Sequence, residues 1–347
     1  MKKLFLFFLA CYAAGSLTAQ DQKNEPFTTK SFANQSIKDV EVETSGGNIT
    51  VESASADKSR VEVFVRPSNG KKNASLSRDE IQKRLDDHYD LKIDLSGSKL
   101  IATAKSRSRK WDRNNALSIS FRIFVGTNVS THLTTSGGNI DIRSLSGVQK
   151  ITTSGGNLAI DRIKGKVNGT TSGGNIHVKD SDDDIHLTTS GGNIDASNCK
   201  GTIKLVTSGG SIRMANLSGK TEATTSGGNV QSNMISGELQ AHTSGGNIDL
   251  AGMSGNLETG TSGGNVRVAI TSPGEFIKIR NSGGDIELQL PANKGYDLDL
   301  AAGKIKTANL ANFSGKSSDD EMNGKLNGGG TKVTVNGGDG RVSLTLK

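Results

Sequence analysis

The sequence predicts an all-β protein: a single-stranded parallel β-solenoid built of 18-residue coils, with two strands in each coil and one short helix near the N-terminus. The first observation behind this prediction is the tripeptide Ser-Gly-Gly, which recurs with a constant 18-residue period. A ninth copy, at Ser282, comes two positions later than this period requires, and another copy precedes the series at Ser45. A fixed period indicates one structural unit stacked on itself. The regular copies begin at Ser136, Ser154, Ser172, Ser190, Ser208, Ser226, Ser244 and Ser262.

The second observation is the alternation of apolar residues within each unit, counted as offsets from its first Ser. Apolar residues occupy offsets 4 and 6, as in Ile140 and Ile142, and alternate again from offset 13, as in Ile203 and Leu205. A period of two marks strands with one buried face. Offset 9 is often apolar as well, which places it at an inward corner. Its residues include Leu145, Ile163, Cys199, Leu217, Ile235 and Met253.

Other repeat architectures fit this pattern less well. Helical hairpin repeats need units of more than about 30 residues, and leucine-rich repeats need about 20 or more with a different Leu pattern. A left-handed helix of hexapeptides would need an inward aliphatic residue every six positions. Offset 10, six positions after the Ile at offset 4, is usually small or polar. A parallel β-solenoid remains.

Two turns separate the strands of each unit. We expect the two glycines of Ser-Gly-Gly to adopt positive φ values, which side chains oppose. A second, weaker turn falls at a Ser-Gly pair near offset 11, as in Ser146 and Gly147. Thr fills offset 17 and Asn fills offset 3, so both side chains stack into columns. The Asn column is interpreted as a structural turn ladder, with a binding stripe as the alternative. Its members are Asn139, Asn157, Asn175, Asn193, Asn229, Asn247 and Asn265.

Residues 1–19 have the pattern of a secretory signal peptide. Two lysines precede an apolar run that is too short to span a membrane, and small residues follow it. Lipidation at Cys11 is disfavoured because the apolar run before it is short and the surrounding residues fit a lipoprotein signal poorly. Cleavage before Gln20 would leave Cys199 as the one cysteine, and its offset indicates a buried small hydrophobe. No second apolar run predicts a transmembrane segment.

The remaining chain divides into three parts. Residues 20–130 form an N-terminal strand-rich cap with a short helix at 77–89, where Ser77 and Glu80 make a capping box. The Thr-Ser-Gly-Gly-Asn-Ile segment near residue 45 predicts that a first coil precedes an insertion. Residues 131–290 form the regular solenoid, and residues 291–347 form a C-terminal cap. Atypical ends protect the exposed strand edges of a solenoid.

The chain resembles a bacterial family through three motifs. Residues 40–51 read Val-x-Val-x-Thr-Ser-Gly-Gly-Asn-Ile-Thr-Val, and residues 286–291 read Ile-Glu-Leu-Gln-Leu-Pro. Residues 328–344 read Gly-Gly-Gly-x-Lys-Val-x-Val-x-x-Gly-x-Gly-x-Val-x-Leu. With the tandem coils, these motifs resemble the DUF4097 family, often labelled putative adhesin, and are similar to auto-transporter-adhesin head domains. The resemblance implies a β-solenoid at the bacterial envelope and transfers no functional residue.

Catalytic and metal-binding patterns are missing from the sequence. It contains no His-Glu-x-x-His, Gly-x-Ser-x-Gly or clustered Cys and His. Asp141, Asp195 and Asp249 recur at offset 5 only in every third coil, too far apart for a pair of catalytic carboxylates. Residues 131–275 contain no aromatic side chain on which a sugar ring could stack. The sequence therefore predicts a protein that is not an enzyme and needs no cofactor or metal.

A basic segment breaks the repeat and is the candidate contact for a polyanion or glycan. Its residues surround the single Trp of the chain, whose ring could stack on a ligand. The alternative interpretation is a solvated connection between two strands. The formal net charge of +7 does not by itself indicate nucleic acid as a partner. The candidate residues are Lys105, Arg107, Arg109, Lys110, Trp111 and Arg113.

These observations favour an exported, non-catalytic interaction scaffold of the adhesin type, which presents a rigid polar face to a surface glycan or a protein. Its expected location is the periplasm, the outer membrane or the cell surface. Two alternatives stay open: a carbohydrate-active β-helix enzyme with its site in the caps, and a self-associating envelope scaffold. The sequence leaves the oligomeric state open.

Overall fold

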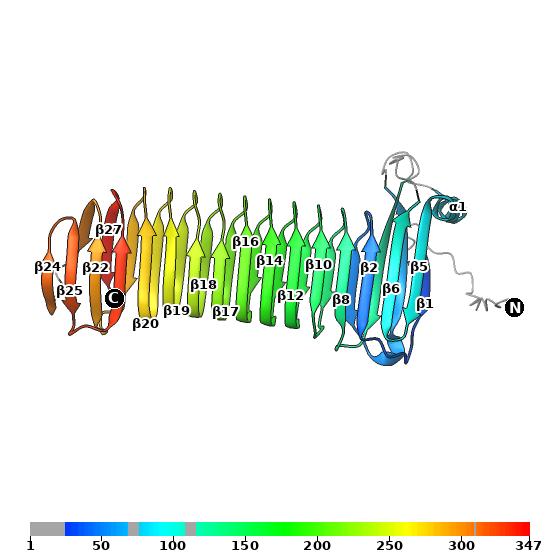
Figure 1. Ribbon diagram of the computed structural model, residues 1–347, viewed down its shortest axis with the longest axis horizontal. Helices are drawn as coiled ribbons and strands as arrows, with labels where there is room; N and C mark the ends of the chain where they lie inside the picture. Colours follow the sequence, from blue (N-terminus) through cyan, green and yellow to red (C-terminus); the bar gives the residue numbers. More distant parts are fainter. Residues whose placement is uncertain (1–24, 69–75, 108–115, 309) are drawn as a thin grey trace.

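Strands stack along one axis into a straight rod, with a short helix beside the N-terminal end (Figure 1). The computed structural model describes residues 25–68, 76–107, 116–308 and 310–347. The predicted signal peptide, residues 1–19, lies outside the described residues. The prediction of an all-β chain with one short helix is confirmed in the described part of the chain.

The regular coils pair in parallel, each residue lying opposite its equivalent in the next coil. Val167 is paired with Ile185, and Ile185 with Ile203. Between Gly255, which is opposite Pro273, and Leu257, which is opposite Ile277, the register lengthens by two positions. Val266 is therefore opposite Ile286. The separate strands of this region are β8 (Ser130–Thr135), β9 (Ile140–Arg143), β10 (Gln149–Thr153), β11 (Leu158–Asp161), β12 (Lys164–Thr171), β13 (Ile176–Lys179), β14 (Asp182–Thr189), β15 (Ile194–Ser197) and β16 (Lys200–Thr207).

Between residues 212 and 281 the two strands of each coil merge into one long bent strand. The odd-numbered strands β9 to β15 and the first halves of the long strands form what we call the ladder sheet. The even-numbered strands β8 to β16 and the second halves form the second sheet. The long strands are β17 (Ile212–Thr224), β18 (Val230–His242), β19 (Ile248–Thr261) and β20 (Val266–Asn281).

A single column of aliphatic side chains fills the space between the two sheets. Inward residues such as Ile176, Ile185 and Leu187 are at most 1% exposed. The apolar residues at offset 9 are equally buried, so the predicted inward corner is confirmed. Burial of this column supplies the main driving force for stacking, because each coil alone leaves its apolar face exposed.

The first coil lies at the N-terminus, as predicted. β2 (Asp39–Thr44) and β3 (Ile49–Ser53) pair in parallel with β8 and β9, so that Val42 is opposite Leu133. On their other side, β6 (Lys99–Ser106) and β7 (Leu117–Val125) extend the second sheet and the ladder sheet, respectively. The insertion between residues 54 and 130 therefore builds the end of the rod.

The caps depart from a purely parallel solenoid. At the N-terminal end, β1 (Thr28–Ser31) and β4 (Arg60–Pro67) add to the ladder sheet, and β5 (Tyr89–Ser96) adds to the second sheet, all in antiparallel pairs. Of these pairs, β5 and β6 form a hairpin, because a short connection can join only antiparallel neighbours. The helix α1 (Arg78–His88) begins as predicted, because Ser77 Oγ accepts the Glu80 N–H at 3.2 Å.

The C-terminal cap closes the two sheets in different ways. The ladder sheet ends in parallel strands, whereas the second sheet ends in antiparallel ones. The edge strands carry lysines such as Lys306 and Lys316, which discourage pairing with another chain. The strands are β21 (Ile286–Leu290), β27 (Arg341–Leu346) and β23 (Lys304–Thr307) in the ladder sheet, then β26 (Thr331–Asn336), β22 (Tyr296–Ala301), β25 (Glu321–Leu326) and β24 (Phe313–Ser317) in the second.

The prediction of positive φ values at the Ser-Gly-Gly glycines is wrong. Their φ values lie outside the left-handed region. The second glycine of each unit is required by space: a Cβ on Gly192 would lie 2.0 Å from the carbonyl oxygen of Gly174. The first glycine has room, since a Cβ on Gly173 would lie 3.7 Å from its nearest neighbour, Ser154 O. We call this Thr-Ser-Gly-Gly-Asn turn the glycine corner.

Positive φ values occur instead at the second turn, which we call the left-handed corner. Asn198 has a φ of 53° and Gly201 a φ of 113°. In one coil Asp183 takes the place of this glycine, with a φ of 90°. Asn and Gly adopt this conformation at the lowest steric cost. The residues at offset 8 with positive φ are Ser144, Arg162, Asp180, Asn198, Asn216, Met234 and Gly252.

Candidate functional site: the polar face of the ladder sheet

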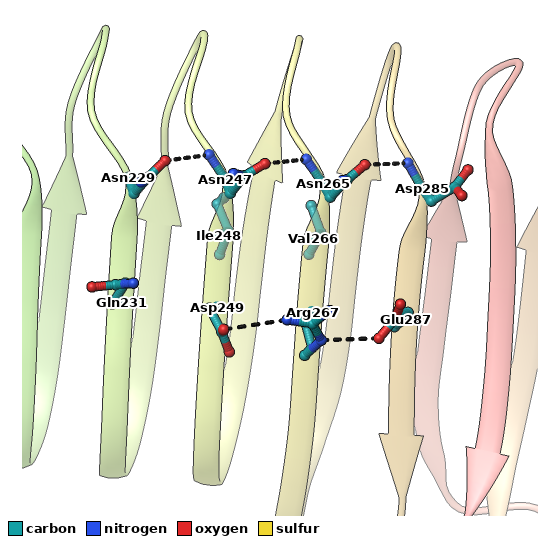
Figure 2. A pocket seen from close by; sticks show the side chains of 10 residues that line it. All are labelled: Asn229, Gln231, Asn247, Ile248, Asp249, Asn265, Val266, Arg267, Asp285 and Glu287. Carbon is teal, nitrogen blue, oxygen red and sulfur yellow. Dashed lines mark hydrogen bonds and ion pairs between the residues drawn. The ribbon is translucent and has the colours of Figure 1, made fainter.

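A column of side-chain oxygens runs along the glycine corner for the length of the rod. Each oxygen accepts the backbone N–H at the same place in the next coil; Asn193 N donates to Asn175 Oδ1 at 2.8 Å. Figure 2 shows the stretch from Asn229 to Asp285. In order, the acceptors are Ser120, Asn48, Asn139, Asn157, Asn175, Asn193, Ser211, Asn229, Asn247, Asn265 and Asp285.

The Thr column lies on the inner side of the same corner. Thr189 Oγ1 donates to Gly174 O at 2.9 Å and accepts the Gly192 N–H at 3.2 Å, so it ties two coils together. Asn281 takes over this role in the last regular coil through its side-chain amide. Because these partners are buried, each bond also prevents the cost of an unpaired polar group. The two columns make the corner rigid.

Charged residues at offset 5 form a second row on the ladder sheet. Asp195 lies 3.2 Å from His177 Nδ1 and 3.4 Å from Arg213 Nη1. Arg267 lies between Asp249 and Glu287, and its hydrogen bond to Glu287 raises the pKa of the guanidinium (Figure 2). The carboxylates predicted to be far apart each face a cation, which is an arrangement for charge balance and not for acid and base catalysis.

A shallow groove of about 310 Å³ lies between the Asn column and the charged row near the C-terminal end. Asp249, Asp285 and Glu287 line it together with Arg267, so its charge is mainly acidic (Figure 2). Within the described residues, no group of three or more His, Cys, Asp and Glu side chains is placed to hold a metal ion. Nor is any helix in that part of the chain long and apolar enough to cross a membrane.

The second sheet carries ion pairs of the same kind. Lys166 lies 2.9 Å from Asp184, and its hydrogen bond lowers the pKa of that carboxyl. Lys204 and Glu222 form a similar pair at 2.7 Å. At the left-handed corner, Cys199 is 1% exposed, and burial raises the pKa of its thiol to about 11. A neutral, covered thiol is a packing group and not a nucleophile.

The basic segment predicted as a polyanion contact is only partly described. Lys105 Nζ lies 2.7 Å from Glu43, which raises the pKa of the ammonium group. Arg107 donates to the carbonyl oxygen of Asp86 at 2.7 Å. Both cations therefore contact the cap itself. The other members, Arg109, Lys110, Trp111 and Arg113, lie outside the described residues.

A patch of arginine and phenylalanine side chains at the N-terminal end of the ladder sheet was missed from the sequence. It consists of outward residues on β4 and β7, which pair with Arg60 opposite Phe124 and Glu62 opposite Arg122. The Arg60 guanidinium lies 3.7 Å from the centre of the Phe124 ring, and that of Arg122 lies 5.4 Å from Phe64. The signal was that Arg and Phe occupy outward, every-second positions on both strands: Arg60, Phe64 and Arg66 on β4, and Arg122 and Phe124 on β7.

A pocket of about 470 Å³ opens beside this arginine–phenylalanine patch, where the Asn column ends. Its position follows from the repeat: Ser120 takes the place of an Asn, and its Oγ accepts the Asn48 N–H at 2.9 Å. At this end of the ladder sheet, aromatic side chains occupy outward positions, where the array has small and charged side chains. The lining residues are Asn48, Thr50, Phe64, Arg66, Ser120, Phe121 and Arg122.

Stacked coils with hydrogen-bonded corners and protected ends define a repeat protein of the β-solenoid class. Residues 178–345 match the family model described as Toastrack DUF4097. This match confirms the resemblance to the DUF4097 family that the motifs suggested.

Several solved structures are similar to this chain at low identity. A putative cell adhesion protein from Clostridium sporogenes is 11% identical, covering 92% of this chain and 98% of its own, with a TM-score of 0.20. A putative adhesin from Bacteroides fragilis is 13% identical over 91% and 96%, with a TM-score of 0.26. A putative adhesin from Parabacteroides distasonis is 13% identical over 91% and 95%, with a TM-score of 0.30. At these TM-scores the likeness carries no conclusion about this chain. Among curated proteins, none matches the sequence.

Proposed function

We propose that this protein is a non-catalytic interaction scaffold of the bacterial envelope, which binds a surface glycan or a protein along the ladder sheet. The observation that carries the proposal is the uninterrupted column of hydrogen bonds from Ser120 to Asp285. Such a column holds the outward side chains of successive coils at a fixed spacing of about 4.8 Å. A preorganised surface loses little conformational entropy when it binds an extended partner.

The charge pattern supports binding in preference to catalysis. Carboxylates on the ladder sheet are paired with cations, as in Asp195 with Arg213 and Asp249 with Arg267. Neither pair offers the two neighbouring carboxyl groups that glycoside hydrolysis uses. The only thiol among the described residues is buried and has a raised pKa.

The proposed function includes a cellular location and a domain organisation for this protein. Residues 1–19 act as a signal peptide, and the protein works in the periplasm, at the outer membrane or on the cell surface. Residues 20–130 and 291–347 cap an array of 18-residue coils at 131–290. The caps keep the rod from growing by strand addition, which supports a discrete scaffold over a self-associating one.

The test is binding of the purified protein to an array of bacterial and host glycans and matrix proteins. We expect specific binding to at least one class of array member. A variant in which Lys105, Arg107, Arg109 and Lys110 are replaced by Gln measures the contribution of the basic segment. If no array member binds, the adhesin-type function is wrong and a structural role inside the envelope takes its place.

A further inference from the structure

We propose that the pocket beside the arginine–phenylalanine patch binds an acidic sugar, with the sugar ring on Phe64 and its anionic group on Arg66 and Arg122. The proposal rests on the proposed function, because it names a ligand class for the same sheet. It places the site where the repeat breaks, at the junction of the N-terminal cap and the first coil. A regular array offers the same surface in each coil, whereas this pocket occurs at one end.

The pocket is lined mainly by hydrogen-bond donors. Asn48 Oδ1 already accepts the Asn139 N–H, so the Asn48 side-chain amide offers its N–H groups. Ser120 Oγ accepts the Asn48 N–H, which leaves its own proton for donation. Thr50 adds a further hydroxyl. Donors converging beside guanidinium groups match a ligand rich in acceptors, such as a sugar with carboxylate or sulfate groups.

The described lining of the pocket carries positive charge. Of the described residues that line it, two are arginines and none is acidic. The nearest carboxylate on the same strand pair, Glu62, is 13% exposed and lies 2.7 Å from Arg60 but 4.0 Å from Arg122. Arg122 itself is 49% exposed. Guanidinium groups pair with carboxylate or sulfate through two parallel N–H donors, which gives orientation as well as affinity.

Phe64 supplies the apolar contact that a sugar ring needs. The half-buried Phe64 side chain lies beside Arg122 and directly opposite Ser120 in the strand pair. The electron-rich face of an aromatic ring attracts the polarised C–H groups of a sugar. No such ring exists between residues 131 and 275, and the groove at the far end of the sheet is mainly acidic. The N-terminal pocket is therefore the place on this face that favours an acidic sugar.

The test uses calorimetric titration in about 150 mM salt, where long-range charge effects are screened. The probes are trigalacturonate for a carboxylate, a carrageenan tetrasaccharide for a sulfate, and maltotriose as the neutral control. We expect at least one acidic probe to bind and maltotriose not to bind. The double variant R66Q/R122Q should weaken that binding at least about tenfold, and Phe64→Leu should weaken it several-fold.

The matched control is K166Q/K204Q, which removes the same charge from the second sheet, away from the pocket and from the ladder sheet. Its affinity should stay within about twofold of the unaltered protein. Circular dichroism checks that all variants remain folded. The inference is overturned if neither acidic probe binds, if maltotriose binds as tightly, or if both double variants lose affinity equally. Binding of an array protein or neutral glycan without either acidic probe overturns this inference alone and leaves the proposed function standing.

Discussion

Each coil has two corners, and the residues that form the turn differ between them. At the glycine corner, the second glycine recurs in every coil because the carbonyl oxygen of the coil before it leaves no room for a Cβ. At the left-handed corner the backbone has a positive φ, and space is also short, since a Cβ on Gly201 would lie 2.2 Å from the carbonyl oxygen of Asp183. The residue there nevertheless varies. Asp183 stands where neighbouring coils have Gly165 and Gly201.

The difference lies in what connects the coils at each corner. The Thr column holds the glycine corner from the inner side, and the Asn column holds it from the outer side. The left-handed corner has shorter runs of side-chain bonds, such as Asn216 to Asn198 and Asn198 to Asp180. Two continuous columns of side-chain bonds hold the glycine corner at close approach in every coil, whereas the shorter runs at the left-handed corner allow Asp183 in one coil.

The largest expected effect is that of Gly192→Ala. Its new methyl group would meet the carbonyl oxygen of Gly174, and the two coils would have to separate. We expect the free energy of unfolding to fall by at least about 3 kcal/mol, measured by urea denaturation. The matched control is Gly191→Ala, whose methyl group would lie 3.6 Å from the nearest atom, Ser172 O. Equal losses for the two variants would refute the assignment of close approach to the second glycine.

The Thr column gives the next largest effect. In Thr189→Val the methyl group that replaces the hydroxyl leaves Gly174 O and Gly192 N–H without this partner in a buried site. We expect a loss of about 2 kcal/mol in unfolding free energy.

The neighbouring Thr188 provides the control for that variant. It is exposed on the outer face, and the next coil has Val206 at the paired position. Thr188→Val should therefore change stability by no more than about 0.5 kcal/mol. A small effect at both threonines would mean that the column contributes packing and not hydrogen bonding.

Much of this architecture was predictable, because the same residue pattern recurs in each coil of the repeat. The alternation at Ile140 and Ile142 predicts the inward column, and Ser77 with Glu80 predicts the helix start. The reason for each glycine was not predictable. Glycine can be required by a positive φ or by a shortage of space, and the sequence does not distinguish these two reasons. At Gly192 the reason is a shortage of space alone, whereas at Gly201 it is a φ of 113° together with a shortage of space.

The arginine–phenylalanine patch shows a second limit of the sequence. Arg60 and Phe64 share one face of one strand, and Arg122 and Phe124 share one face of another. Nothing in the chain between them indicates that the two strands pair antiparallel, with Arg60 opposite Phe124. The non-repetitive cap gives one example of each contact, so its pairing could not be inferred from a period.

The smallest expected effect is a gain of stability at the left-handed corner. Asp183 has a φ of 90°, which costs an L-residue about 1–2 kcal/mol, while Gly adopts it freely but loses more entropy on folding. Asp183→Gly should therefore raise the free energy of unfolding by about 0.5–1 kcal/mol. Asp182→Gly removes the same charge where φ is not positive, and it should lower stability by a similar amount. If both changes raise stability, relief of repulsion within the run of three aspartates explains the gain, and the φ value of Asp183 does not.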